Sequence, residues 1–266
     1  MARDSIFSVE RDLFVPGPLA GGPWDPSALH GGAPAALIVT ELERTLPEQL
    51  ALGRLSIELL RPVPSAPLAL TIEAIRPGRR VRELSVELRN EEELVCRASA
   101  LAVQCVPAVA VDAAKTDPAE LVPSGTLPPP DSPEARPFDA DGPLSPAFAS
   151  AIEMRWLTQP WRTGPAQLWM RMRADVLPDV AASPLAALAA AADFGNGVGA
   201  ELHFDRFIFI NADLSIHLWR PPEGEWIGLD ARTLLFQGGA GVAESVLHDV
   251  RGPVGRAFQT LVVQPR

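Results

Sequence analysis

The stretch Leu55-Ser56-Ile57-Glu58-Leu59-Leu60-Arg61-Pro62 returns as Leu214-Ser215-Ile216-His217-Leu218-Trp219-Arg220-Pro221. The two copies lie about 160 residues apart, far more than the ~20–50-residue period of solenoid and propeller repeats. Further strand-like segments follow each copy and end in Leu101–Gln104 and Leu261–Gln264. We infer a duplicated domain whose two copies share one fold, and we expect the chemistry where the copies differ.

The apolar residues of the first half change from a helical period to a period of two. Leu37, Ile38 and Leu42 fall at helical spacing within residues 35–44. From Leu55 onward, apolar and polar residues alternate in three segments, and a fourth strand is predicted at residues 94–103. A helix followed by four closely connected strands predicts an antiparallel sheet, because parallel strands need long crossover connections.

The second half repeats this plan. Ser183 and Pro184 form a strong helix start, and the alanine- and leucine-rich run to Phe194 is stopped by Gly195. This helix has almost no polar face, so we expect a sheet to wrap around it. Four more strands are predicted from roughly residues 208, 226, 241 and 254.

Proline, alanine and acidic residues dominate the segment between the two halves, which is typical of a linker. We therefore predict an N-terminal domain at residues 1–106, a linker at 107–146 and a C-terminal domain at 147–266.

Composition excludes several classes of function. A net charge of −10 argues against binding to nucleic acid, which requires a basic surface. No apolar run is long enough to span a membrane, and the first residues do not form a signal peptide, so we expect a cytoplasmic protein. Cys96 and Cys105 are nine residues apart in one predicted strand and point to opposite faces, which excludes a mutual disulfide while that strand stays extended.

Metal and cofactor chemistry is also disfavoured. The four histidines show no metal-ligand spacing with cysteines or carboxylates. The glycine-rich segments 195–199 and 238–241 do not follow a strand and open a helix, as phosphate-binding loops do. A Gly-x-Ser-x-Gly nucleophile motif is absent from the sequence. We therefore expect no metal and no cofactor.

Five segments in order resemble the acyl-CoA thioesterase family related to thioesterase II. They are His30–Gly32, Ala192–Gly197, Asn211–His217, Gly224–Asp230 and Gly255–Leu261. The resemblance implies an α+β double hot-dog fold, in which two tandem copies of a curved antiparallel sheet each wrap around a long central helix. It also implies hydrolysis of acyl-CoA to free acid and CoA, an activity of lipid metabolism.

The family holds its reactive water with an aspartate, a hydroxyl residue and a glutamine from the second half. The resemblance places these roles on Asp213, Thr233 and Gln259, with a one-residue gap before Thr233. Counting back from the repeated segments puts Arg54 and Ser99 at the positions of Asp213 and Gln259. The first half would then be a structural partner without a site of its own.

The residues themselves give partial support. Thr233 and Gln259 lie on otherwise apolar strand faces, where a polar group needs a partner. Asp213 shares its strand face with polar neighbours, so pattern alone favours an aspartate that caps the start of a strand. His30, Gly31 and Gly32 are candidate substrate-binding residues, because glycines let the backbone approach a ligand closely.

Two other functions stay open. A hot-dog dehydratase or hydratase would use His30 with an acidic residue, and Asp25 is the nearby carboxylate in the sequence. A third possibility is a protein that binds acyl thioesters without cleaving them. A homo-oligomer is also possible, although a fused pair already contains the interface that single hot-dog domains form by dimerising.

Overall fold

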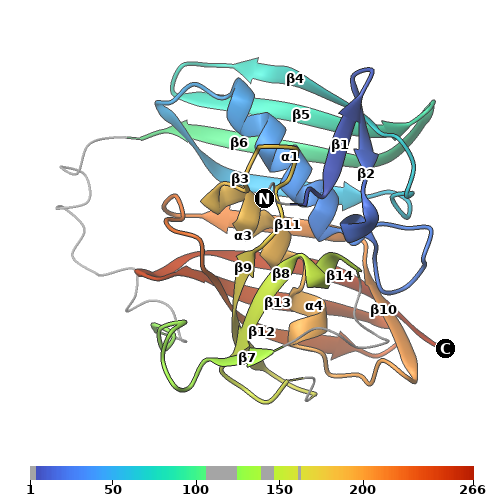
Figure 1. Cartoon of the computed structure of the whole chain (residues 1–266), viewed down its shortest axis with the longest axis vertical. Coiled ribbons are helices and arrows are strands. Elements are labelled where there is room, and N and C mark those ends of the chain that lie inside the picture. Colours follow the sequence, from blue (N-terminus) through green and yellow to red (C-terminus); the bar gives the residue numbers. More distant parts are fainter. Residues whose placement is uncertain (1–3, 106–124, 139–146, 161–162) are drawn as a thin grey trace.

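The computed structural model describes residues 4–105, 125–138, 147–160 and 163–266. The first half contains a hairpin, a short 3-10 turn, one long helix and four long strands: β1 (Phe7–Glu10), β2 (Leu13–Pro16), η1 (Pro18–Ala20), α1 (Gly32–Thr45), β3 (Leu50–Leu59), β4 (Ala69–Pro77), β5 (Val81–Asn90) and β6 (Glu93–Gln104). The helix and the four strands after it follow the order that the periodicity predicts (Figure 1).

The second half has more strands and three shorter helices. Its elements are β7 (Arg136–Phe138), α2 (Ala147–Ser150), β8 (Ile152–Trp156), β9 (Ala166–Met172), α3 (Pro184–Ala192), α4 (Gly195–Val198), β10 (Phe207–Asn211), β11 (Asp213–Leu218), β12 (Ile227–Phe236), β13 (Ala240–Asp249) and β14 (Gly252–Pro265). Of the predicted linker, residues 107–124 and 139–146 lie outside the described residues. Residues 125–138 are described, and they contain β7, which pairs with β8.

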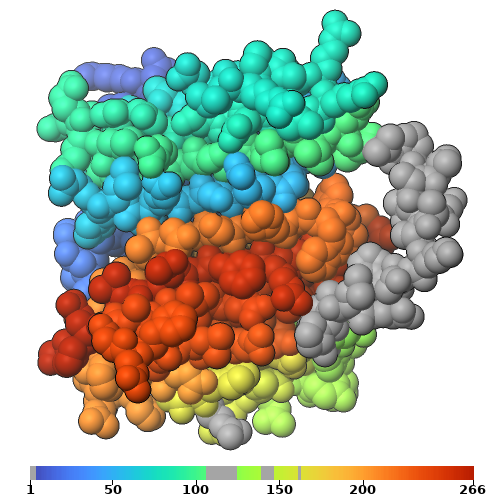
Figure 2. Space-filling view, turned by 180° about the vertical axis from the view of Figure 1, so that it is seen from behind, coloured from blue at the N-terminus to red at the C-terminus, as the bar shows by residue number. Residues whose placement is uncertain are grey.

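The repeated stretches meet each other in space. β3 pairs antiparallel with β11, and Ser56 lies opposite Ser215, its own counterpart in the repeat. Leu55 likewise pairs with Ile216, and Ile57 with Leu214, so the ladder is symmetric about its centre. This ladder joins the strands of both halves into one twelve-stranded sheet with the order β4-β5-β6-β3-β11-β14-β13-β12-β9-β8-β7, and β10 pairs with β14. Figure 2 shows β3 (blue) beside β11 (orange) on the outer face.

Helices α1 and α3 fill the interior and run antiparallel to each other. All of α1 from Gly32 to Thr40 is buried, as are the residues of α3 from Ala186 to Ala192. The side chain of Ser183 caps α3 through the amide of Ala186 and donates to Glu43 near the end of α1. The start of α3 therefore lies at the end of α1. The end of α3 accordingly lies at the start of α1, which is where the candidate site is found.

The structure corrects one detail of the second helix, which was predicted as a continuous segment to Phe194. Helix α3 ends at Ala192, and a separate turn, α4, begins at Gly195. A Cβ atom on Gly195 would lie 2.6 Å from the hydroxyl of Ser245 and 2.8 Å from the amide oxygen of Gln259. Only glycine allows α4 to lie this close to the sheet. The two helices leave Asp193 and Phe194 at the break.

Candidate active site

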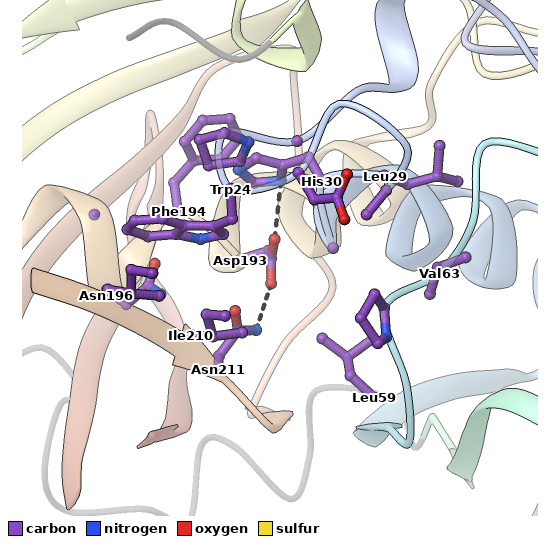
Figure 3. Close-up of a pocket in the computed structure, with 18 of the residues that line it drawn as sticks. Trp24, Leu29, His30, Leu59, Val63, Asp193, Phe194, Asn196, Ile210 and Asn211 are labelled. Carbon is purple, nitrogen blue, oxygen red and sulfur yellow. Dashed lines mark hydrogen bonds and ion pairs between the residues drawn. The ribbon is translucent and has the colours of Figure 1, made fainter. Parts of the chain in front are cut away.

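A cavity of about 910 Å³ opens where α1 begins and α3 ends (Figure 3). Most of the side chains that line it are apolar or aromatic, which is typical of a small-molecule site with a few orienting polar groups. Its buried polar side chains are His30, Asp193, Asn196 and Asn211.

Asp193 is the centre of this polar group. Its carboxylate is 4 % exposed, and an ionised carboxylate at this depth requires hydrogen-bond donors. The side-chain amide of Asn211 donates to Oδ1 at 2.8 Å, and His30 Nδ1 lies 2.9 Å from Oδ2. Figure 3 shows the carboxylate between these two partners. The three side chains come from the helix break, from the end of β10 and from the loop before α1, so the cluster spans both halves.

Gln259 forms hydrogen bonds with the backbone at the helix break. Its amide oxygen accepts from the backbone N–H of Asn196 at 2.9 Å, and its Nε2 donates to the backbone oxygen of Asp193 at 3.0 Å. Nε2 also lies 3.5 Å from Asp193 Oδ1. The predicted residue Gln259 is therefore part of the cluster. It fixes the backbone at Asp193 and, three residues later, at Asn196.

His30 packs as an aromatic group and contacts Asp193 through its edge. Its ring stacks on Phe194 at 4.3 Å and on Phe148 at 5.0 Å between centroids. Its Nδ1 atom also lies 3.0 Å from the amide nitrogen of Gly32. One ring nitrogen cannot donate and accept at once, so a proton on Nδ1 forms the bond to Asp193. In the tautomer with its proton on Nε2, Nδ1 instead accepts from the backbone N–H of Gly32.

The two predicted glycines at the start of α1 have different surroundings. A Cβ atom on Gly31 would lie 2.8 Å from each carboxylate oxygen of Asp193, and Gly31 lines the cavity. A Cβ atom on Gly32 would instead meet Phe148 and the backbone oxygen of Ala190, inside the protein. Gly31 is therefore needed for the carboxylate to reach the N-terminus of α1, whose dipole favours negative charge.

Asp213 does not belong to the cluster, contrary to the expectation from the resemblance. It lies on the outer face of β11 with Ser215 and His217, and its Oδ1 accepts from the backbone N–H of Thr260 at 2.7 Å. Successive residues of a strand point to opposite faces, and Gln259 points inward next to the outward-facing Thr260. The outward direction of Asp213 is the one that its strand parity predicts.

Thr233 is also outside the cluster. It faces inward and is buried, but it pairs with Ala243, which in turn pairs with Gln259. Two strand spacings separate it from Gln259, which is roughly 10 Å. Thr233 does not line the cavity, and its hydroxyl has no hydrogen-bond partner among the described residues.

The predicted match between Ser99 of the first half and Gln259 of the second half is wrong by one residue. Ser99 pairs with Ser56, whereas Phe258 pairs with Ser215, so Phe258 is the counterpart of Ser99. Gln259 then corresponds to Ala100, which is apolar. The first half still lacks the glutamine. Arg54 stays the counterpart of Asp213, and it binds Ser99 on the outer face.

Sequence reasoning missed Asp193 and Asn211, although both segments had been singled out. A signal was present in each case. Asp193 is an acidic residue at the end of a helix without a polar face, and Asn211 follows the apolar run Ile208–Ile210. Both therefore required a buried partner. Each proved to be the partner of the other.

Within the described ranges, no group of three or more histidine, cysteine or acidic side chains could hold a metal ion. Among the same residues, no helix is both long enough and apolar enough to cross a membrane.

Comparison with known proteins agrees with this architecture. The model of the acyl-CoA thioesterase C-terminal domain matches residues 126–263, and the model of the N-terminal domain matches residues 20–104. No curated protein matches the chain.

Solved structures match almost the whole chain. A hot-dog protein from Alicyclobacillus acidocaldarius is 17 % identical, with a TM-score of 0.72 over 97 % of this chain and 95 % of its own. Acyl-CoA thioesterase II TesB2 from Mycobacterium marinum is 16 % identical, with a TM-score of 0.66 over 97 % and 94 %. A TesB protein from Mycobacterium avium subspecies paratuberculosis is 17 % identical, with a TM-score of 0.65 over 97 % and 95 %. These likenesses confirm the predicted double hot-dog fold.

Proposed function

We propose that the protein cleaves acyl-CoA with a water molecule activated by Asp193. The chain belongs to the acyl-CoA thioesterase family and is a thioester hydrolase. The observation that carries this proposal is the carboxylate of Asp193. It is buried, it lines the cavity, and side chains from both halves hold it in place. A buried carboxylate facing a cavity is a candidate general base.

The reaction needs a nucleophile and a polarised carbonyl. Asp193 accepts a proton from water while the water oxygen attacks the carbonyl carbon of the thioester. The tetrahedral intermediate then breaks its C–S bond, and the CoA thiolate leaves and takes up a proton. General-base help of this kind typically contributes ~10²–10⁴ in rate. The N-terminus of α1 at Gly31 favours the negative charge that develops on the carbonyl oxygen.

The other members of the cluster orient the base. Asn211 binds Oδ1 of Asp193 directly, so it limits rotation of the carboxylate. Gln259 binds the backbone of Asp193 and of Asn196, so it fixes the position from which the carboxylate projects. The proposal therefore assigns the base to Asp193 in place of Asp213, and makes Gln259 a positioning residue.

The test compares two isosteric variants, Asp193→Asn and Asp213→Asn. Asparagine keeps the shape but removes the proton acceptor, so Asp193→Asn should release CoA thiol at least ~10²-fold more slowly. It should still bind acyl-CoA, as measured by calorimetry. Asp213→Asn is the matched control, because its side chain bonds Thr260 on the outer face and should leave turnover unchanged. Full activity in Asp193→Asn would contradict the assignment.

A second candidate is addition of water to an enoyl thioester, and the contact between His30 and Asp193 favours it. The sequence offered only Asp25 as a partner for His30. In the structure Asp25 is exposed and bonds Ser27, whereas Asp193 lies 2.9 Å from the imidazole. The loss of enoyl absorbance without release of thiol would support this activity. Thiol release alone would support hydrolysis.

A further inference from the structure

The cavity has an open end and a deep end, and the exposure of its lining separates them. Leu60, Ile210 and Val262 line the open end and are 46 %, 41 % and 55 % exposed. Met154 and Trp156 line the same cavity but are 2 % and 1 % exposed. Both are on β8 and face the interior of the second half. The cavity therefore runs from the surface to the inner face of β8.

Hydrocarbon and aromatic surfaces form the deep end. The rings of Phe138 and Trp156 meet edge to face with centroids 6.3 Å apart. Val198 of α4, which is buried, lines the same cavity. Among the charged residues that line the cavity, Asp25, Arg61 and Arg266 are exposed. Asp193 is the buried acidic residue, and it lies at the helix break.

We infer that the deep end holds the tail of an unsubstituted hydrocarbon acyl group, and that Trp156 and Phe138 limit its length. This inference rests on the proposed function, because Asp193 fixes where the thioester lies. The acyl tail then extends inward, and the CoA portion leaves through the open end. Each methylene buried in such a pocket is worth roughly fourfold in kcat/KM, until the chain meets the aromatic wall.

The same wall excludes polar tails. A carboxylate at the far end of the acyl chain would be buried among Phe138, Met154 and Trp156, which offer no counter-ion and only the indole N–H of Trp156 as a donor. Burial of an unpaired charge is strongly unfavourable, so the enzyme should reject acyl groups that end in a carboxylate. The structure thus favours simple fatty acyl thioesters over dicarboxylic ones of equal length.

The experiment measures kcat/KM for straight-chain acyl-CoAs from acetyl to palmitoyl, and for one ω-carboxyacyl-CoA of the preferred length. Trp156→Leu should move the optimum to longer chains, with a gain on the order of tenfold for two additional methylenes. Phe138→Ala, at an edge strand, should shift it in the same direction and serves if Trp156→Leu folds poorly. Val198→Phe narrows the space and should move the optimum to shorter chains.

The matched control is Trp219→Leu, a tryptophan that is 42 % exposed and bonds Pro253. It should leave the chain-length profile unchanged. An unchanged optimum in Trp156→Leu, Phe138→Ala and Val198→Phe would overturn the inference. Equal rates for the ω-carboxy substrate and its unsubstituted analogue would also overturn it.

Failure of the proposed function gives a different result. If no acyl-CoA releases thiol, calorimetry measures how acyl-CoAs of different chain length bind to Asp193→Asn, with and without Trp156→Leu. A shift of the preferred chain length in Trp156→Leu would then support the pocket without the reaction. Hydrolysis with an unchanged profile would support the reaction and refute the pocket.

Discussion

Replacement of Gly31 by alanine tests whether the position of Asp193 matters for catalysis. The added Cβ would lie 2.8 Å from both carboxylate oxygens, whereas ordinary contacts of this kind begin near 3.4 Å. The carboxylate would therefore have to move by roughly half an ångström, and a misplacement of ~1 Å can cost about 10²-fold in rate. We expect Gly31→Ala to release CoA thiol between about 10-fold and 10²-fold more slowly.

The backbone should not oppose this substitution. Gly31 has φ −59° and ψ −23°, which alanine adopts readily, so the effect should come from the side chain. Gly197→Ala is the matched control, because Gly197 also lines the cavity and its Cβ would meet Phe204 at an ordinary 3.8 Å. Thiol release is measured for both variants, and thermal melting confirms that both fold. Equal rates in Gly31→Ala and Gly197→Ala would refute the reasoning.

Three further predictions follow from buried polar groups. Gln259→Ala leaves the amide of Asn196 and the carbonyl of Asp193 without partners, so urea denaturation should show a loss of about 2 kcal/mol or more, together with slower thiol release. Thr233→Val removes a buried hydroxyl that has no partner among the described residues. Turnover should therefore stay unchanged, and the free energy of unfolding should be equal or rise by about 1 kcal/mol. A large loss of turnover would restore Thr233 to the site. Burial lowers the pKa of His248 from 6.5 to about 4, with Asp249 raising it and Arg220 lowering it to smaller extents. Its folded pKa lies below the unfolded value, so this contribution to stability is complete above pH ~6.5 and is lost as pH falls toward 4. Urea denaturation across that range should show a loss of ~3 kcal/mol that is absent in His248→Leu.

Much of the fold could be predicted because duplication and periodicity leave clear marks in a sequence. The repeated octapeptide indicated two copies, and strict alternation fixed which face of each strand is buried. The break between α3 and α4 could not be predicted in the same way. It depends on Gln259, which is more than sixty residues away in the sequence and binds Asp193 and Asn196. A glycine at position 195 indicated a helix end, but not a functional turn.

The site was harder to predict, because its members are adjacent only after folding. His30 and Asp193 meet because α1 and α3 run antiparallel, and no local pattern reports that arrangement. Asp213 was favoured by its place in a motif, although its strand parity pointed outward. A rule based on burial would have selected Asp193, since a carboxylate at the end of an apolar helix must find partners inside the protein.

The ladder between β3 and β11 also has a consequence for how the chain folds. Its residues pair across about 160 positions, and the entropy of closing so long a loop makes such contacts form late. Until they form, each half exposes an unpaired strand whose sequence nearly matches that of its partner. A strand β3 from one chain can then pair with β11 of another, which gives a swapped dimer. We expect refolding at high protein concentration to yield more of this dimer, which size-exclusion chromatography would detect. A substitution at Ser56 that weakens the ladder should slow the pairing of β3 with β11 of the same chain.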